Sequence, residues 1–147
     1  MNAPPTTTAV TIWHATRIFD VFLTQHIEGK SAENEIWQTS GWAKATAYDP
    51  TGVGTNGWGA VTGYTLEEVA AIPKMRAETV YGYYEEVTGK IRDYLDNVTE
   101  SELDQPSIGF EGRQPNYFWV RHPLFDLTRH VGESMAIKVG AGGSLRQ

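Results

Sequence analysis

The feature that most constrains the fold is a long stretch of helical periodicity that begins near residue 65. Apolar side chains recur there every three or four residues over about thirty residues, which is the spacing of one face of an α-helix. Thr65 and Glu68 form a start signal, because a threonine and a glutamate three residues later can cap a first turn reciprocally. Pro73 is expected to kink this helix or to split off its first turn. The apolar stripe consists of Val69, Ile72, Val80, Tyr84, Val87, Ile91, Tyr94 or Leu95, and Val98.

Two other segments show the same helical spacing. Residues 11–28 carry apolar side chains around much of the helix circumference, which predicts burial on more than one side, and Gly29 is a stop signal. Residues 115–139 form the last expected helix, interrupted or bent at Pro123. Its expected core stripe is Val120, Leu124, Leu127, Val131 and Met135. With no convincing strand, these helices predict an all-α fold, an up-down helical bundle.

The connecting segments contain turn residues and one misleading motif. Residues 48–59 are a glycine-rich loop that includes the pattern Gly52-x-Gly54-x-x-Gly57. We reject a dinucleotide-binding interpretation, because no strand precedes the pattern and no helix opens directly on it. Thr99 to Glu102 is a second capping box. We expect one domain over residues 1–147, with residues 1–8 and 140–147 flexible.

The composition excludes several classes of protein. The chain has no cysteine, which excludes disulfides and thiolate chemistry by its own side chains and suits a cytoplasmic protein. The net charge of −6 argues against a nucleic-acid partner, because phosphate binding requires a basic patch. We expect no membrane span and no secretory signal, since no apolar run is long enough and no basic region precedes one.

The candidate site residues lie on the last expected helix. His122, Asp126 and His130 occur at i, i+4 and i+8, so their side chains share one face, which Glu133 continues. Imidazole and carboxylate groups in this arrangement suit a divalent metal. The same spacing also fits a solvated or merely hydrogen-bonded face, and spacing alone does not decide between these hypotheses.

Two histidines precede this helix. His14 lies beside Trp13 one turn into the first helix, whereas His26 lies near its end, where we expect it to be exposed. Tryptophans 37, 42 and 58 cluster in the irregular segment. They are expected either to plug the end of the bundle or to line the rim of a pocket or a dimer contact.

The segment from Arg121 to Ser134, RHPLFDLTRHVGES, resembles the last helix of the DinB/YfiT-like superfamily of bacterial four-helix bundles. In that family a His-x-x-x-His pair precedes a small residue and then a polar one, as His130-Val131-Gly132-Glu133 does here, and Asp126 stands where the first histidine of the pair is expected. The sequence Ile12-Trp13-His14 is similar to the position of the third ligand. The resemblance covers residues 9–140.

The resemblance implies a divalent metal held by His14, Asp126 and His130, with His122 as a substitute ligand. Zinc and nickel are the first candidates for this metal. Beside it, the implied substrate pocket would be formed by Trp13, Phe118, Phe125, Arg129 and Glu133. No catalytic residue is identified.

The family also implies activities. Some members are similar to transferases that use a low-molecular-weight thiol, mycothiol or bacillithiol, so we expect a thiol S-transferase or a hydrolase acting on a small molecule. The alternative is a non-catalytic small-molecule-binding or stress-response dimer with a degenerate metal site, which Asp126 favours. Because only 13 residues precede His14, we expect the opening helix of the family to be missing or shortened. The bundle would then be truncated, rearranged or completed by a second chain in a homodimer.

Overall fold

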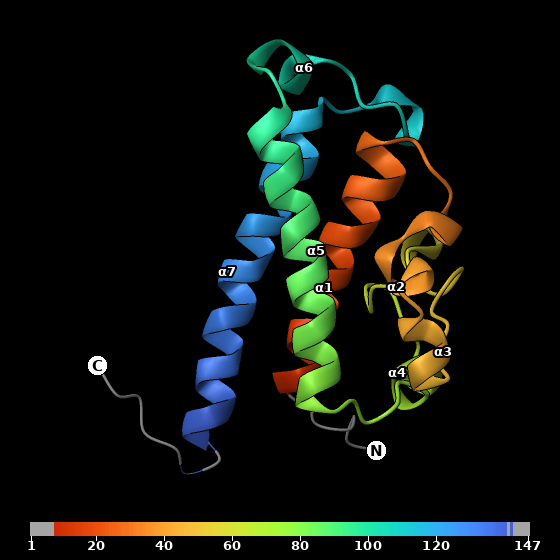
Figure 1. Cartoon of the computed structure of the whole chain (residues 1–147). Helices are drawn as coiled ribbons and strands as arrows, with labels where there is room; N and C mark the ends of the chain where they lie inside the picture. Colours follow the sequence, from red (N-terminus) through yellow and green to blue (C-terminus); the bar gives the residue numbers. More distant parts are fainter. Residues whose placement is uncertain (1–7, 141, 143–147) are drawn as a thin grey trace.

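Three long helices lie side by side and form the body of the protein (Figure 1). The structure is a computed structural model that describes residues 8–140 and 142. The long helices are α1 (Thr8–Val21), which continues as a π-helical turn η1 (Phe22–Ile27), α5 (Ala77–Asn97) and α7 (Asn116–Gly140). The short elements are η2 (Ala32–Asn34), α2 (Ile36–Thr39), α3 (Trp42–Thr46), η3 (Thr55–Gly57), α4 (Leu66–Ala70), α6 (Glu100–Asp104) and η4 (Phe110–Gly112).

The predicted all-α class is confirmed over the described part of the chain. An isolated bridge between Pro106 and Pro115 is the closest approach to β-structure there. None of the described helices combines the length and the apolar character needed to cross a membrane. The termini expected to be flexible lie outside the described residues, apart from the helical Thr8 and Gly140 and the turn residue Gly142.

The order of helix directions differs from a simple up-down bundle. The Tyr83 hydroxyl donates a hydrogen bond to Asp20, and the Lys90 ammonium donates one to Thr24, so later residues of α1 face later residues of α5. These two helices are therefore parallel, and α7 runs in the opposite direction (Figure 1). The physical reason is the connection formed by residues 28–76, which returns the chain to the end where α1 begins instead of turning directly into α5.

The capping signals at residues 65 and 99 act as predicted. The Glu68 backbone N–H donates to the Thr65 hydroxyl over 3.2 Å, and the Thr65 N–H donates to the Glu68 carboxylate over 2.7 Å. The same reciprocal pair starts α6. Pro73 separates α4 from α5 rather than kinking one continuous helix, because a proline lacks the N–H that the next turn needs. Gly29 follows the end of the first helix with φ +65°, a conformation that glycine adopts readily.

The core surrounds α1, whose predicted burial on several sides is confirmed. One cluster of buried residues joins the second half of this helix to α7 through Phe22 and Trp119. The other joins its first half to α2 and α5 through Trp13, Trp37 and Tyr83, each of which is fully buried. Burial of these large rings contributes much of the apolar stabilisation.

The predicted core stripe of α7 is wrong in part. Leu124, Val131 and Met135 are 51%, 47% and 50% exposed. The helix instead packs against α1 through the neighbouring face, which carries the buried Trp119 and Pro123. Pro123 lies within an uninterrupted α7. The helix therefore has two apolar faces, and the more regular one is left open.

Candidate metal centre

His14, Asp126 and His130 come together where α1 crosses α7, and we refer to this candidate site for a metal ion as the metal centre. One ligand atom from each lies within 4.8 Å of the others. The Asp126 Oδ2 atom is 3.4 Å from His14 Nε2 and 3.2 Å from His130 Nε2. The side chains of His14 and His130 are 12% exposed and that of Asp126 is 20% exposed, so the group is largely withdrawn from water.

The sequence places these side chains in two steps. Asp126 and His130 are one turn apart on α7, so they share a face of that helix. His14 reaches them because α1 packs antiparallel to α7. Farther along the same interhelical contact, the rings of Phe22 and Trp119 pack edge to face. The imidazole rings of His14 and His130 meet edge to face with centroids 4.6 Å apart.

Hydrogen bonds to the far side of each ring determine which nitrogen faces the centre. His14 Nδ1 lies 2.5 Å from the backbone oxygen of Ala60, and His130 Nδ1 lies 2.6 Å from a carboxylate oxygen of Glu133. Both of those oxygens only accept hydrogen bonds, so each Nδ1 carries the proton and donates it. With both rings in the neutral form, each turns the lone pair of Nε2 toward Asp126, which is how metal-binding histidines are commonly oriented.

The atoms that face one another at the centre are all acceptors. Burial lowers the pKa of His14, and the neighbouring His130 lowers it further, so the His14 ring favours its neutral form. His130 Nε2 is buried and has no hydrogen-bond partner. The second oxygen of Asp126, Oδ1, accepts a hydrogen bond of 2.8 Å from Arg129, which leaves Oδ2 for the centre. Two lone pairs and a carboxylate oxygen at this spacing repel one another unless a cation or an extra proton lies between them.

A strained turn positions the oxygen that holds His14. Val61 has φ +67°, which is a rare conformation for a β-branched residue. The Thr62 N–H donates to the Ala60 oxygen over 2.8 Å, so the turn closes around Val61 and aims that oxygen. Backbone strain of this kind persists where the surrounding structure imposes it, and it concentrates at functional sites.

Two hollows border the metal centre, and both include Thr62. One, of about 240 Å³, is lined by His14, His130 and Glu133, among others. The other, of about 450 Å³, contains Asp126 and Arg129, with the remaining lining from Ile18, Phe22, Trp58, Thr62, His122 and Phe125. Aromatic walls and an arginine beside the candidate ligands suit a small molecule with a flat or apolar part.

The other residues expected at the pocket have different positions. Phe125 and Arg129 line the larger hollow and Glu133 the smaller one. His122 also lies in the larger hollow, where its ring stacks on Phe118 at 5.3 Å, and it is not one of the three residues of the metal centre. Trp13 is fully buried against Trp37 and Tyr48 in the core, because its ring leaves α1 on the side opposite to the pocket.

His26 was expected to be exposed, and this prediction is wrong. The residue is 3% exposed, and both of its ring nitrogens are buried without a hydrogen-bond partner. Burial lowers its pKa to about 4. Its ring stacks on Trp119 at 4.1 Å. Phe22, Trp58 and Phe110 complete the surrounding aromatic cage. These rings come from segments that are far apart in the sequence, which local periodicity does not reveal.

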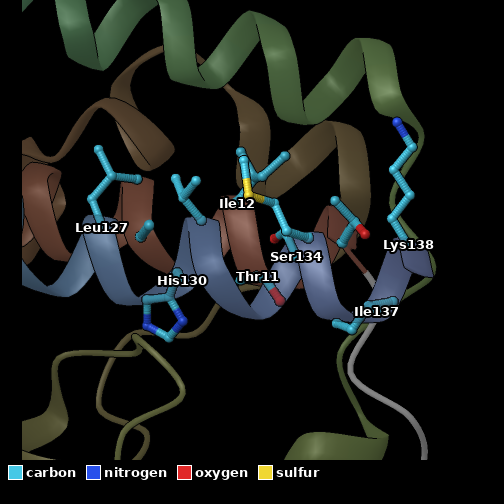
Figure 2. A pocket seen from close by; sticks show the side chains of 11 residues that line it. Thr11, Ile12, Leu127, His130, Ser134, Ile137 and Lys138 are labelled. Atoms are coloured by element: carbon cyan, nitrogen blue, oxygen red, sulfur yellow. The ribbon is translucent and has the colours of Figure 1, made fainter. Parts of the chain in front are cut away.

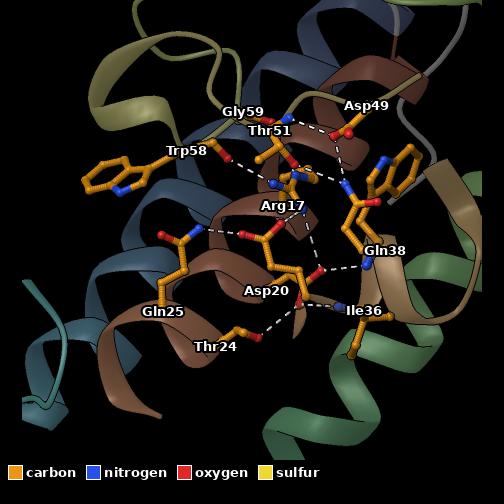
Figure 3. Close-up of polar contacts among 12 residues, drawn as sticks. Arg17, Asp20, Thr24, Gln25, Ile36, Gln38, Asp49, Thr51, Trp58 and Gly59 are labelled. Atoms are coloured by element: carbon orange, nitrogen blue, oxygen red, sulfur yellow. Dashed lines mark hydrogen bonds and ion pairs between the residues drawn. The ribbon is translucent and has the colours of Figure 1, made fainter. Parts of the chain in front are cut away.

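A second polar cluster on α1 was not anticipated (Figure 3). Its members are Arg17, Asp20, Glu35 and Tyr83, all fully buried, and we call them the buried network. Arg17 donates to Glu35 over 2.7 Å and to the backbone oxygens of Trp58 and Gly59. Asp20 accepts from the Tyr83 hydroxyl and from the backbone N–H groups of Ile36 and Trp37. The available signal was an arginine and an aspartate three residues apart in a helix with no other arginine, lysine, aspartate or glutamate.

The buried network fastens the connecting segment to α1. Asp20 satisfies N–H groups at the start of α2, which is a cap supplied from another helix.

A comparison with known proteins finds no family model, no curated protein and no solved structure that matches this chain.

Proposed function

We propose that this protein is a divalent-metal-dependent enzyme of DinB-like type that acts on a small molecule. The metal, for which zinc and nickel are the first candidates, would be held by His14, Asp126 and His130. The observation that carries the proposal is the convergence of three acceptor atoms within 4.8 Å, with His130 Nε2 buried and unpartnered. A bound cation would turn this mutual repulsion into attraction.

The donor set fits such an ion. Two imidazoles and one carboxylate are ligands that zinc and nickel accept, and three protein ligands leave positions free for a substrate or water. A metal bound there would supply Lewis acidity, lowering the pKa of a bound thiol or water molecule. We favour transfer of a low-molecular-weight thiol such as mycothiol or bacillithiol, with hydrolysis as the second reaction type.

The chain's own residues would position the reactants. Ala60 and Glu133 fix the two rings, and Arg129 fixes the carboxylate by occupying its outer oxygen. A substrate in the larger hollow would lie against Trp58 and Phe125 next to Asp126. Arg129 would favour an anionic group on that substrate, since its side chain is 69% exposed at the edge of the same hollow.

A non-catalytic binding module on the same bundle is the second candidate. The ion pair between Arg129 and Asp126 favours it, because this pairing competes with a metal for the charge of the carboxylate. Such a module would bind a small molecule in the aromatic hollow without metal dependence.

Metal titration tests the proposal directly. Protein freed of metal with a chelator is titrated with zinc or nickel chloride in a calorimeter, and we expect one ion per chain. His14→Ala and His130→Ala should each remove this binding. His122→Ala is the matched control, because His122 lies on the same helix outside the metal centre and should leave binding intact. Failure of the parent protein to bind either ion would overturn the metal centre.

The enzymatic part needs its own measurement. The metal-loaded protein is incubated with a thiol and a panel of electrophilic or ester substrates, and product is followed by mass spectrometry. Turnover that is lost in His130→Ala supports the enzyme. Binding of the same compounds with equal affinity in the presence and absence of metal, and without turnover, supports the binding module instead.

A further inference from the structure

A continuous apolar groove runs along α1 between α5 and α7. Three adjoining hollows of about 480, 230 and 540 Å³ make up this groove, and Ile12 and Leu127 line all three. Figure 2 shows the first of them, whose lining includes Leu127, His130, Ser134 and Lys138 of α7 and Thr11 and Ile12 of α1. The groove lies where a further helix would complete a bundle around α1.

The groove exposes an unusual amount of apolar side chain. Ile12 is 41% exposed on its floor, and Tyr81, Leu124, Val131 and Met135 on its walls are between 47% and 64% exposed. Single exposed apolar residues need no explanation, but a contiguous patch of this kind marks a surface that another molecule covers. The groove is therefore a candidate interface.

The spacing of the wall residues suits a helix as the covering element. On α5 the lining side chains include Tyr81, Tyr84, Thr88 and Ile91, and on α7 they include Leu124, Leu127, Val131, Ser134 and Lys138. Both rows alternate steps of three and four residues. This is the pattern by which two helices interlock their side chains. Each wall thus offers a seam for one partner helix.

The charges at the outer edges of the two walls have opposite sign. On α5 the exposed residues next to the seam are Glu78, Glu85 and Asp96, with a single cation, Arg92. On α7 the cations are Arg121, which lies next to the seam, and Lys138, which ends the seam, and both are exposed. The acidic residues of α7, Asp126 and Glu133, project from the face that carries the metal centre. The α5 edge is therefore predominantly acidic, and the α7 edge is basic.

We propose that a second copy of this chain covers the groove, with α5 of each protomer packed against α7 of the other. A two-fold axis parallel to the helices produces this arrangement. It makes each new pair of helices antiparallel, because α5 and α7 already run in opposite directions, and it brings the acidic edge of one copy to the basic edge of the other. Such a contact uses the same patch on both copies and closes on itself.

Measurement of the mass in solution tests the proposal. Sedimentation equilibrium of the full chain should give twice the chain mass of 16.3 kDa at micromolar concentration. Val131→Glu places a charge in the groove and should return the protein to the single-chain mass. Leu66→Glu is the matched control, because Leu66 is 55% exposed on the separate helix α4 and does not line any of the three hollows. It should leave the dimer intact.

A charge exchange tests the packing of α5 against α7. Glu78→Lys and Lys138→Glu should each weaken self-association at least several-fold at low salt, and the double variant should recover most of the loss. Circular dichroism confirms that each variant is folded.

Several outcomes would overturn the proposal. A parent protein that has the single-chain mass at 100 µM would overturn it. This holds even if the groove of that protein binds an apolar dye or another helix. Equal loss of the dimer in Val131→Glu and Leu66→Glu, or in neither of them, would place the contact elsewhere. None of these measurements depends on the metal centre, so the two proposals stand or fall separately.

Discussion

The metal centre and the buried network are two clusters of ionisable side chains on the same helix, and they differ in how their polar atoms are satisfied. In the buried network donors and acceptors alternate, so Arg17, Asp20 and Glu35 each have partners at hydrogen-bond distance. In the metal centre the facing atoms are all acceptors. A satisfied and sealed cluster is typical of structural fastening, whereas an unsatisfied convergence beside a hollow is typical of a ligand site.

The largest expected effect is the difference in unfolding free energy between replacing the arginine of the buried network and replacing the arginine beside the metal centre. Arg17→Met should lower the free energy of unfolding by about 3–5 kcal/mol, because it leaves Glu35 and Asp20 buried without their counter-charge. Arg129→Met should cost less than about 1 kcal/mol, since the Arg129 side chain is 69% exposed and screened by water. Urea unfolding of both variants provides the measurement. Equal losses would remove the distinction between the clusters.

The stabilisation that metal provides should be lost when Asp126 is replaced and kept when Asp20 is replaced. At a free zinc or nickel concentration one hundred times the Kd, the parent protein should gain about 2.7 kcal/mol of stability, read as a higher Tm. Asp126→Ala should abolish this gain and leave the metal-free protein at least as stable, because it removes one of three mutually repelling acceptors. Asp20→Asn should lower the stability of the metal-free protein and still respond to metal. A response to metal retained in Asp126→Ala would contradict the ligand assignment.

His26 sharpens the comparison, because its nitrogens are unpartnered but no other ligand group lies with them. Its pKa falls from 6.5 to about 4 on folding, so the unfolded chain binds more protons between these values. Stability should therefore be complete above pH 6.5 and decline as the pH falls, by about 2 kcal/mol at pH 5. His26→Phe should remove this part of the decline. Denaturant unfolding at a series of pH values measures it, and an unchanged pH dependence in the variant would show that His26 is accessible to protons in the folded state.

Local sequence signals predicted the elements of the fold well. Apolar spacing located the three long helices, and the threonine–glutamate pairs at residues 65 and 99 located two helix starts. The one-turn separation of Asp126 and His130 placed both on one face of α7. These features depend on residues within a few positions of one another, so the sequence alone contains the necessary information.

The features that sequence analysis missed depend on the path of the chain. The parallel arrangement of α1 and α5 follows from how residues 28–76 return, which periodicity does not specify. The same segment brings Glu35 to Arg17 and the Trp58 ring to His26. On α7 a helical wheel shows two apolar faces, and only packing decides that the stripe through Val131 stays open.

The smallest expected effect concerns the strain at Val61, which belongs to the metal centre and has no counterpart in the buried network. Val61→Gly relieves the cost of φ +67°, about 1–2 kcal/mol for a residue with a side chain, but adds chain entropy to the unfolded state and removes apolar contact. We expect stability to change by less than about 1 kcal/mol. The same exchange at the buried helical Val80 should cost several times more, because nothing there is relieved. Glycine adopts this turn more readily, so the Ala60 oxygen should still point toward His14. The Kd for zinc should therefore stay within about threefold of that of the parent protein. A tenfold weaker Kd would show that the valine side chain itself supports His14, and the strain would then be part of the site rather than a consequence of aiming one oxygen.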